Sequence, residues 1–124
     1  KKLIQLLTIC NSKNIQLSVF INPRKKIIEI AKSLGFHAVE LHTGPLDREK
    51  VNKLDVKKIN EMINYSYKKN LIVNIGHGLN FSNIKYIKNR HKVDTVHIGH
   101  FIISEAIFLS LPKVIKIFKN LIKL

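Results

Sequence analysis

Cysteine is almost absent from this sequence, since Cys10 is the only one among 124 residues. A single thiol can form neither an internal disulfide nor a metal site built from several cysteines. Disulfide-stapled secreted scaffolds are therefore excluded. A reducing compartment is the natural setting for such a chain, and we expect it to be cytoplasmic.

Long apolar runs are missing as well. The opening stretch "KKLIQLLTIC" is interrupted by Gln5 and Thr8, and no small-residue cleavage site follows, so we do not expect a signal peptide. The stretch also falls far short of the roughly 20 apolar residues that span a bilayer. No linker rich in glycine, serine or proline divides the chain, and 45% of its residues are hydrophobic. We therefore expect one globular domain over residues 1–124.

Acidic residues are few: 8 Asp and Glu stand against 22 Lys and Arg, for a formal net charge of +14. Such an excess suggests a polyanionic partner, either nucleic acid or an anionic membrane surface. However, the only arginines are Arg24, Arg48 and Arg90, and the lysines are spread over the whole chain. A phosphate-reading surface favours clustered arginine, so the pattern argues against a dedicated nucleic-acid or membrane surface.

What is present is an alternation of short apolar segments with amphipathic ones. Four segments rich in β-branched residues predict strands, at residues 15–21, 37–42, 71–76 and 93–99. Helices are predicted at residues 24–35, at about 56–70, after Ser82, at 101–111 and after Pro112. Pro23 is expected at the first position of its helix and Gly35 at the end of the same helix. This order is typical of a parallel α/β sheet with helical crossovers.

Four such units form either a small doubly wound sheet or half of an eight-fold barrel, and the polar residues favour the barrel. They gather at the ends of three successive predicted strands: Glu40 and His42, Asn74 and His77, and His97 and His100. Barrel enzymes build their active sites on that face. The motifs "NIGHGLN" and "HIGH" also hold glycines that let backbone approach an anion at a helix start.

These motifs carry a resemblance. "LSVFI", "AVELHTG", "VNIGHGLNFSNI" and "VHIGHFIISEAIF" resemble, in the same order and at similar spacing, the successive strand ends of the pyridoxine 5'-phosphate synthase family. The similarity runs from Ile15 to about Leu121, and residues 1–14 match the helix before the fifth strand. It implies the C-terminal half of a (β/α)8 TIM barrel, with about four parallel βα units and a C-terminal helix.

The resemblance also implies a reaction. The family condenses 3-amino-2-oxopropyl phosphate with 1-deoxy-D-xylulose 5-phosphate and releases phosphate and water as the pyridine ring of pyridoxine 5'-phosphate, a vitamin B6 compound, closes. The expected partners are therefore these small phosphorylated substrates, and the full-length family implies a homo-oligomer. No cofactor is implied.

Residue by residue, the resemblance gives His77 as the proton donor and Glu40 as a carboxylate important for catalysis. Gly78 matches a contact to the aminoketone phosphate, and Gly99 and His100 match the pair that receives a phosphate through backbone N–H groups. Read from the residues alone, His77 is either catalytic or a capping residue on its turn, and the flanking glycines favour catalysis. Glu40 is either catalytic or part of a structural ion pair inside the barrel.

The roles of the other polar residues are not decided by the sequence. His42 and Thr43 either orient Glu40 or cap the loop, and Asn74 either lines the barrel or forms a hydrogen bond within it. The family more often has a non-histidine polar residue at His97, which we interpret as tolerated variation. His37 and His91 are expected to be exposed. The histidines come singly from different strands, so no metal site is predicted.

The tetrapeptide His97-Ile98-Gly99-His100 also occurs where class I aminoacyl-tRNA synthetases hold ATP. That interpretation requires the motif early in a Rossmann-type domain, whereas here only about one helix follows the last predicted strand. We therefore set it aside.

The family's first half supplies two catalytic bases, a histidine and a glutamate, and the arginines and asparagine that bind the substrate phosphates and carbonyls. No segment here resembles that half. We therefore expect the chain alone to be inactive, whether it is a fragment, a split product that needs a partner or a non-functional gene remnant. The alternative function is a basic α/β module that keeps the scaffold and binds nucleic acid or another acidic partner.

Overall fold

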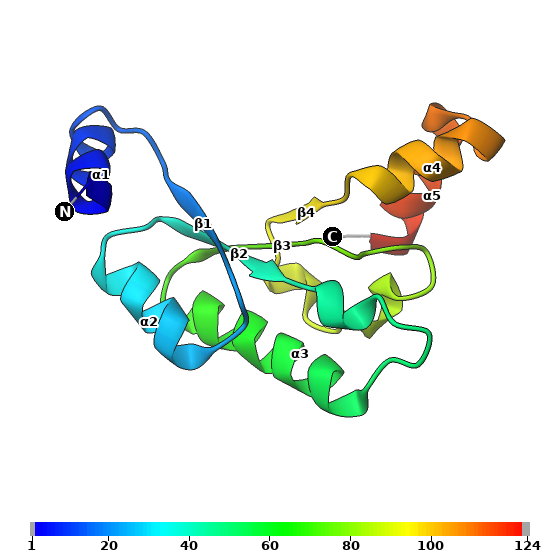
Figure 1. Ribbon diagram of the computed structural model, residues 1–124, viewed down its shortest axis with the longest axis horizontal. Helices are drawn as coiled ribbons and strands as arrows, with labels where there is room; N and C mark the ends of the chain where they lie inside the picture. The colour runs from blue at the N-terminus through cyan, green and yellow to red at the C-terminus, as the bar shows by residue number, and fades with distance from the viewer. Residues whose placement is uncertain (1, 123–124) are drawn as a thin grey trace.

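The computed structural model describes residues 2–122, and its strands form one parallel sheet in the order β1–β2–β3–β4 (Figure 1). The strands are β1 (Ser18–Ile21), β2 (Ala38–His42), β3 (Ile72–Gly76) and β4 (Thr95–His97). The helices are α1 (Lys2–Ser12), α2 (Lys25–Ser33), α3 (Lys53–Lys68), α4 (His100–Leu109) and α5 (Leu111–Ile122). Single 3-10 turns are η1 (Gly44–Leu46), η2 (Ile84–Tyr86) and η3 (Arg90–Lys92). The predicted α/β fold with four parallel strands is confirmed.

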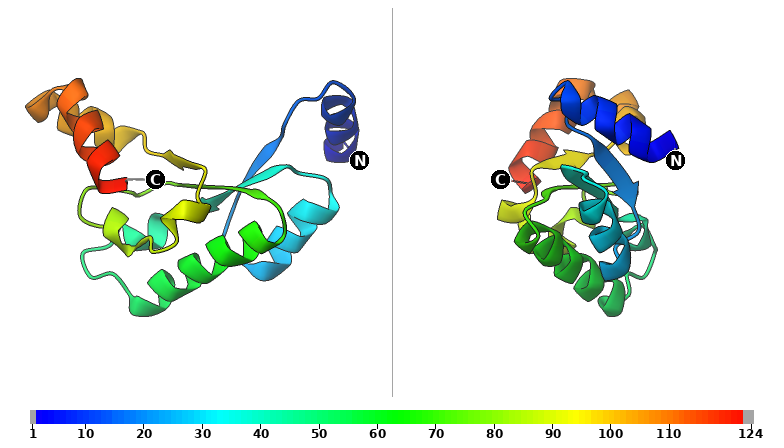
Figure 2. Two further views of the ribbon diagram at one scale, coloured as in Figure 1. Left: turned by 180° about the vertical axis from the view of Figure 1, so that it is seen from behind. Right: turned by 90° about the vertical axis from the view of Figure 1, so that its left-hand side faces the viewer.

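The core lies on one face of the sheet, because successive side chains of a strand point to opposite sides. In the two central strands this face is aliphatic and at most 1% exposed: Val39, Leu41, Val73 and Ile75. These side chains pack with buried residues of α2 and α3, which cover the face (Figure 2). Burying each of them contributes about 1.5–3 kcal/mol.

The opposite face carries the polar residues. Strand pairing aligns two rows across it, first Phe20, Glu40, Asn74 and Thr95, then His42, Gly76 and His97. Helix α1 stands near the amino end of the sheet on this side, and α4 and α5 stand near the carboxyl end (Figures 1 and 2). Phe20 remains 54% exposed between them. Side chains on this face are therefore accessible to a ligand or to another part of a barrel.

Helix α2 ends as predicted but begins differently. Gly35 has φ +89°, and its N–H donates to the Lys32 carbonyl at 3.1 Å, which closes the helix. At the start, Arg24 is the extended capping residue. Pro23 therefore lies before the cap rather than at the first helical position, and that expectation was wrong.

The expected α-helix opened by Ser82 was also wrong, since the segment forms only η2 and η3. Asn60 of α3 is the main cause. Its amide donates to the Tyr86 carbonyl at 2.8 Å and accepts from the Lys88 N–H at 2.7 Å. The Tyr86 carbonyl and the Lys88 N–H are backbone groups that an α-helix through this segment would pair internally.

Helices α4 and α5 are attached to the loops that follow β3. Phe81 lies between them, with ring centroids 5.0 Å from Phe101 of α4 and 4.7 Å from Phe118 of α5. The Arg90 side chain donates to the Leu121 carbonyl at the end of α5. This attachment fixes where α4 begins relative to β3. Within residues 2–122, no helix is long and apolar enough to cross a membrane.

Candidate functional site

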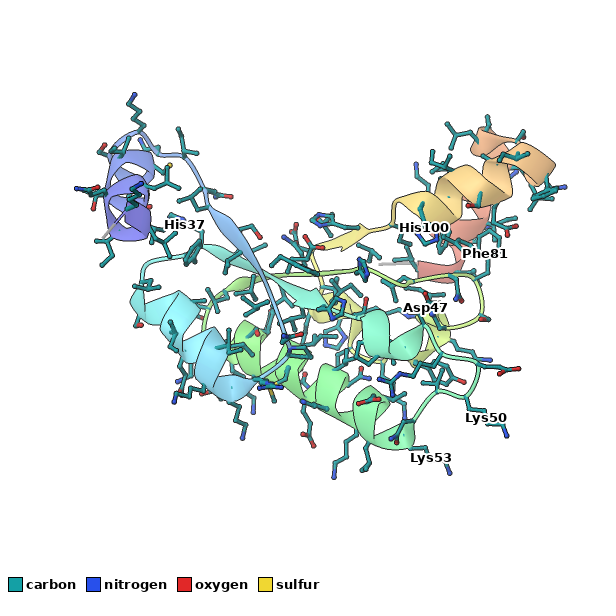
Figure 3. All side chains as sticks on the ribbon, viewed as in Figure 1. His37, Asp47, Lys50, Lys53, Phe81 and His100 are labelled. Carbon is teal, nitrogen blue, oxygen red and sulfur yellow. The ribbon has the colours of Figure 1, made fainter. Side chains whose placement is uncertain are left out.

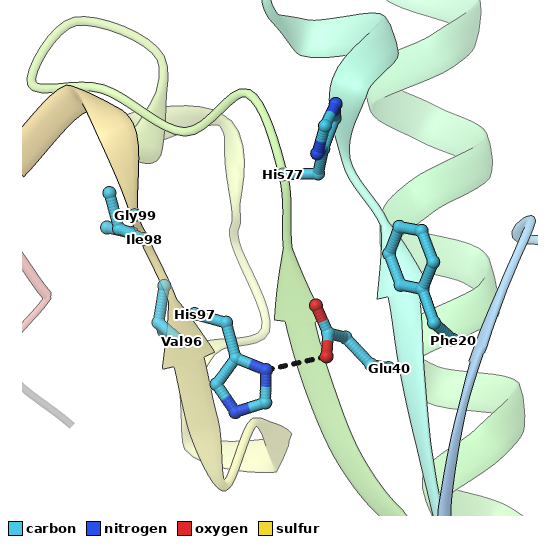
Figure 4. Close-up of a pocket in the computed structure, with 7 residues that line it drawn as sticks. All are labelled: Phe20, Glu40, His77, Val96, His97, Ile98 and Gly99. Atoms are coloured by element: carbon cyan, nitrogen blue, oxygen red, sulfur yellow. Dashed lines mark hydrogen bonds and ion pairs between the residues drawn. The ribbon is translucent and has the colours of Figure 1, made fainter.

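The face of the sheet opposite the core, which carries the polar residues, is called the inner face, and its shortest polar contact joins Glu40 of β2 to His97 of β4. Glu40 Oε2 lies 2.6 Å from His97 Nδ1 (Figure 4). The two strands are not neighbours, because β3 runs between them. Gly76 of β3 leaves the space for this contact, since a Cβ atom there would collide with Glu40 Oε1 and lie 3.1 Å from His97 Cβ. His97, which we interpreted as tolerated variation, is therefore a direct partner of a predicted site residue.

His77 follows β3 on a tight turn. Its φ is +73° and that of Gly78 is +72°, a left-handed conformation that is unfavourable for a non-glycine residue. Thr43, which follows β2 and is fully buried, holds this turn in place. Its N–H donates to the Gly76 carbonyl at 2.8 Å, and its hydroxyl lies within 2.8 Å of the carbonyl oxygens of Gly76 and His77. Of the two roles considered for Thr43, this geometry fits holding the loop.

Three rings meet at the carboxyl ends of the first three strands. The His42 ring centroid lies 4.9 Å from that of His77 and 5.4 Å from that of Phe20. Burial lowers the pKa of His42 below its ordinary value of 6.5, and the nearby His77 imidazole lowers this pKa further. His42 therefore packs against His77 and favours its own neutral form.

Asn74 lies in the same row as Glu40 and is 8% exposed. Its Oδ1 is fully buried and forms no hydrogen bond with the described residues. A buried carbonyl oxygen of this kind costs free energy unless it finds a donor. Asn74 therefore lies on the inner face with a buried acceptor oxygen that no described residue pairs, which is compatible with the role of lining a barrel.

Two adjoining hollows lie at this end of the sheet. The larger has a volume of about 650 Å³ and is open to solvent, and it is lined by Phe20, Glu40, His77, Val96, His97, Ile98 and Gly99 (Figure 4). The smaller, about 120 Å³, is lined by Asp47, His77, Gly78, Leu79, Asn80, His97, Ile98, Gly99, His100 and Phe101. His77, His97, Ile98 and Gly99 belong to both, so the two hollows form one continuous site.

The predicted site residues are thus brought together in two groups. Glu40, His77 and Gly99 line the larger hollow, and His77, Gly78, Gly99 and His100 line the smaller one. His100 is the first residue of α4 (Figure 3). A Cβ atom at Gly99 would have no neighbour within 4 Å. The backbone before α4 is therefore open to close approach by an anion.

His37 and His91 are exposed, as expected. Figure 3 shows His37 at the amino end of the sheet, far from His100. Among residues 2–122, no group of three His, Cys, Asp or Glu side chains could hold a metal ion.

Sequence reasoning missed several residues of the site: Phe20, Asp47, Asn80 and the contact made by His97. Phe20 could have been found from the alternation in β1, because it lies on the same face as Glu40. Asp47 and Asn80 lie in loops, and only the folded chain brings them together, with the Asn80 amide 3.3 Å from the Asp47 carboxylate.

The family model described as "Pyridoxal phosphate biosynthesis protein PdxJ" matches residues 1–124. The chain is 38% identical over 112 residues to a pyridoxine 5'-phosphate synthase of Blochmanniella pennsylvanica. The aligned residues make up 88% of the chain and 46% of that protein. The chain is 35% identical over 125 residues to one of Pelagibacter ubique, covering 98% and 52%. A synthase of Prochlorococcus marinus is 34% identical over 117 residues, covering 93% and 49%. The chain spans about half the length of the curated relatives it matches.

Proposed function

Because the chain belongs to the pyridoxal phosphate biosynthesis protein PdxJ family, we propose that it supplies the C-terminal half of a pyridoxine 5'-phosphate synthase. The family is a TIM-barrel family, and the four-stranded parallel sheet is consistent with half of that barrel. The reaction proposed is the condensation of 3-amino-2-oxopropyl phosphate with 1-deoxy-D-xylulose 5-phosphate. One observation carries the proposal: His77 and Gly99 line both hollows at the carboxyl ends of the strands.

In this proposal His77 donates a proton during ring closure. Histidine suits the task because its ordinary pKa lies near neutrality. The left-handed turn at His77, held by Thr43, keeps His77 among the residues that line both hollows. Strain concentrated at such a position is typical of functional turns. Glu40 supplies the carboxylate of the site from the neighbouring strand.

Gly78, Gly99 and His100 are proposed to bind the phosphate of the aminoketone substrate. The start of α4 offers backbone N–H groups to an anion, and Gly99 removes the side chain that would keep an anion at a distance. Gly78 adds backbone from the neighbouring turn, where its φ of +72° favours glycine. The smaller hollow joins these three residues.

The remaining general bases are expected from the other half of the barrel. We therefore propose that the chain alone has no turnover, and that the complete assembly is a cytoplasmic homo-oligomer. Removing one general acid or base typically lowers a rate by about 10² to 10⁴. A site that lacks two of them should form no measurable product.

The test combines the chain with the N-terminal half of the Blochmanniella pennsylvanica synthase, the part that the chain does not match, and measures pyridoxine 5'-phosphate formation. Neither half should form product, and the combination should. In the combination, His77→Ala should lower kcat by about 10² to 10⁴ with little change in KM. His91→Ala, at an exposed histidine outside both hollows, is the matched control and should leave the rate unchanged.

Turnover by the chain alone would contradict the proposed division of the site. A folded combination that forms no product, or a His77→Ala combination as fast as the unmodified one, would contradict the proposed activity.

A further inference from the structure

The Glu40–His97 contact has the geometry of an oriented imidazole. Nδ1 is the nitrogen engaged, at 2.6 Å from the carboxylate. No hydrogen bond in the described part of the chain involves Nε2 of the same ring. A ring held in this way by a carboxylate has its tautomer and its orientation fixed, which leaves the other nitrogen free to act on a ligand.

Accessibility distinguishes the two partners. The side chain of Glu40 is 21% exposed and that of His97 is 46% exposed. His97 lines both hollows, whereas Glu40 lines only the larger one. A ligand that spans the two hollows therefore meets the imidazole more readily than the carboxylate.

Gly76 makes the arrangement specific. Glu40 and His97 belong to strands separated by β3, so their side chains meet only above the residue of β3 that lies between them. Any side chain at Gly76 would occupy the position of the Glu40 carboxylate. The pair thus depends on three residues from three strands, unlike a surface ion pair between flexible side chains.

We propose that Glu40 and His97 form a carboxylate–imidazole dyad, in which Glu40 is a positioning residue and His97 exchanges a proton with the ligand. Glu40 accepts the Nδ1–H bond and fixes the neutral tautomer. Nε2 takes a proton from the ligand, and the carboxylate stabilises the imidazolium that results. The same Nε2 then returns the proton to the ligand or to water. The identity of the ligand rests on the proposed function, whereas the dyad itself does not.

Other titratable groups near the dyad are few. In the larger hollow the third such residue is His77, which packs against His42. The smaller hollow has two further titratable residues in its lining, Asp47 and His100. Neither hollow is lined by lysine or arginine. Glu40 is therefore the one carboxylate that lines the larger hollow, and it contacts His97 directly.

The first experiment uses the chain itself and needs no substrate. Two-bond ¹H–¹⁵N NMR spectra report which nitrogen of each neutral imidazole carries the proton. His97 should carry it on Nδ1, in contrast to exposed His37 and His91, which serve as internal references. Glu40→Met should return His97 to the reference pattern. Gly76→Ala should do the same without altering either partner, because the added Cβ displaces the carboxylate.

Glu61→Met is the matched control, since Glu61 is a half-exposed carboxylate paired with Lys57 on α3. It should leave the His97 pattern unchanged. A proton on Nε2 of His97 in the unmodified chain overturns the dyad, and so does an Nδ1–H pattern that persists in Glu40→Met. The measurement on the unmodified chain decides the matter even where a variant fails to fold.

The second experiment uses the combination with the complementary half. His97→Ala and Glu40→Met should each lower kcat, and the double variant should be no slower than the slower single variant, because the residues act as a unit. Independent losses that multiply in the double variant would contradict the shared role. An Nδ1–H tautomer in an assembly without turnover would instead support the dyad and contradict only the synthase activity.

Discussion

The side-chain hydroxyl of Thr43 lies 2.8 Å from the carbonyl oxygen of His77, and this contact joins the end of β2 to the turn after β3. The hydroxyl also lies 2.7 Å from the Gly76 carbonyl. His77 has a left-handed backbone, which costs about 1–3 kcal/mol for a non-glycine residue and persists only because its surroundings hold it. Thr43 is therefore the residue that stabilises the position of the predicted proton donor.

Replacing Thr43 by valine should remove this stabilisation at nearly constant volume. The Thr43 hydroxyl has one hydrogen to donate and the Gly76 carbonyl keeps the Thr43 N–H, so one hydrogen bond is lost and the free energy of unfolding should fall by about 1 kcal/mol. Urea denaturation at low protein concentration measures the change. Thr95→Val is the control, because the Thr95 hydroxyl is exposed, and its effect should stay within about 0.5 kcal/mol. Equal effects of the two substitutions would show that Thr43 has no special role.

The two phosphate-site glycines should respond differently to valine. At Gly99 a Cβ atom has no neighbour within 4 Å, so Gly99→Val should leave the urea midpoint nearly unchanged while it blocks phosphate binding. At Gly78 the φ is +72° and a Cβ atom would lie 2.8 Å from Asp47 Cβ, so Gly78→Val should destabilise the fold clearly. Unfolding curves and phosphate titrations of both variants provide the comparison. Strong destabilisation by Gly99→Val would contradict the open geometry before α4.

Stability should depend on the protonation of His42. Its pKa in the folded chain lies below 6.5, first because of burial and then because of His77. The unfolded chain therefore binds the proton more readily, so stability is fully present above pH 6.5 and falls as the pH drops through the lowered pKa of His42. His42→Asn should flatten this part of the stability curve, whereas His37→Asn should not. A pH dependence that is identical in all three chains would refute this assignment.

The isolated chain should self-associate. On α4, Ile107 is 78% exposed and Phe108 is 82% exposed, and the edges of β1 and β4 have no strand partner among residues 2–122. Exposed apolar surface and open sheet edges both promote association. Sedimentation velocity should detect oligomers whose proportion rises with concentration. A monodisperse monomer with a cooperative thermal transition would show that the sheet is better closed than its edges suggest.

Much of the fold could be predicted from local pattern. The alternation of apolar residues in β2 and β3 and the glycine at the end of α2 are local signals, and the structure follows them. The missing helix after Ser82 depends on Asn60, more than 20 residues away in the sequence, and no local pattern reports such a bond. Long-range side-chain bonds thus explain the largest error.

The candidate site could likewise be predicted only in part from the sequence. The polar residues at the strand ends were identifiable, because parallel strands bring their carboxyl ends to one edge of the sheet. The Glu40–His97 contact was not, because it requires the register of three strands and the missing side chain at Gly76. The left-handed backbone of His77 was also hidden, since only its neighbour Gly78 suggested a turn of that kind.

Titration of the ¹⁵N-labelled chain with inorganic phosphate tests the central claim most directly. The amide signals of Gly78, Gly99 and His100 should shift together and saturate, because the three residues line one hollow. The shifts should be absent in Gly99→Val and unchanged in His91→Ala. Signals that move mainly along the lysine-rich surface of α3, with the three site amides unaffected, would contradict a phosphate site and favour the alternative of a basic binding module.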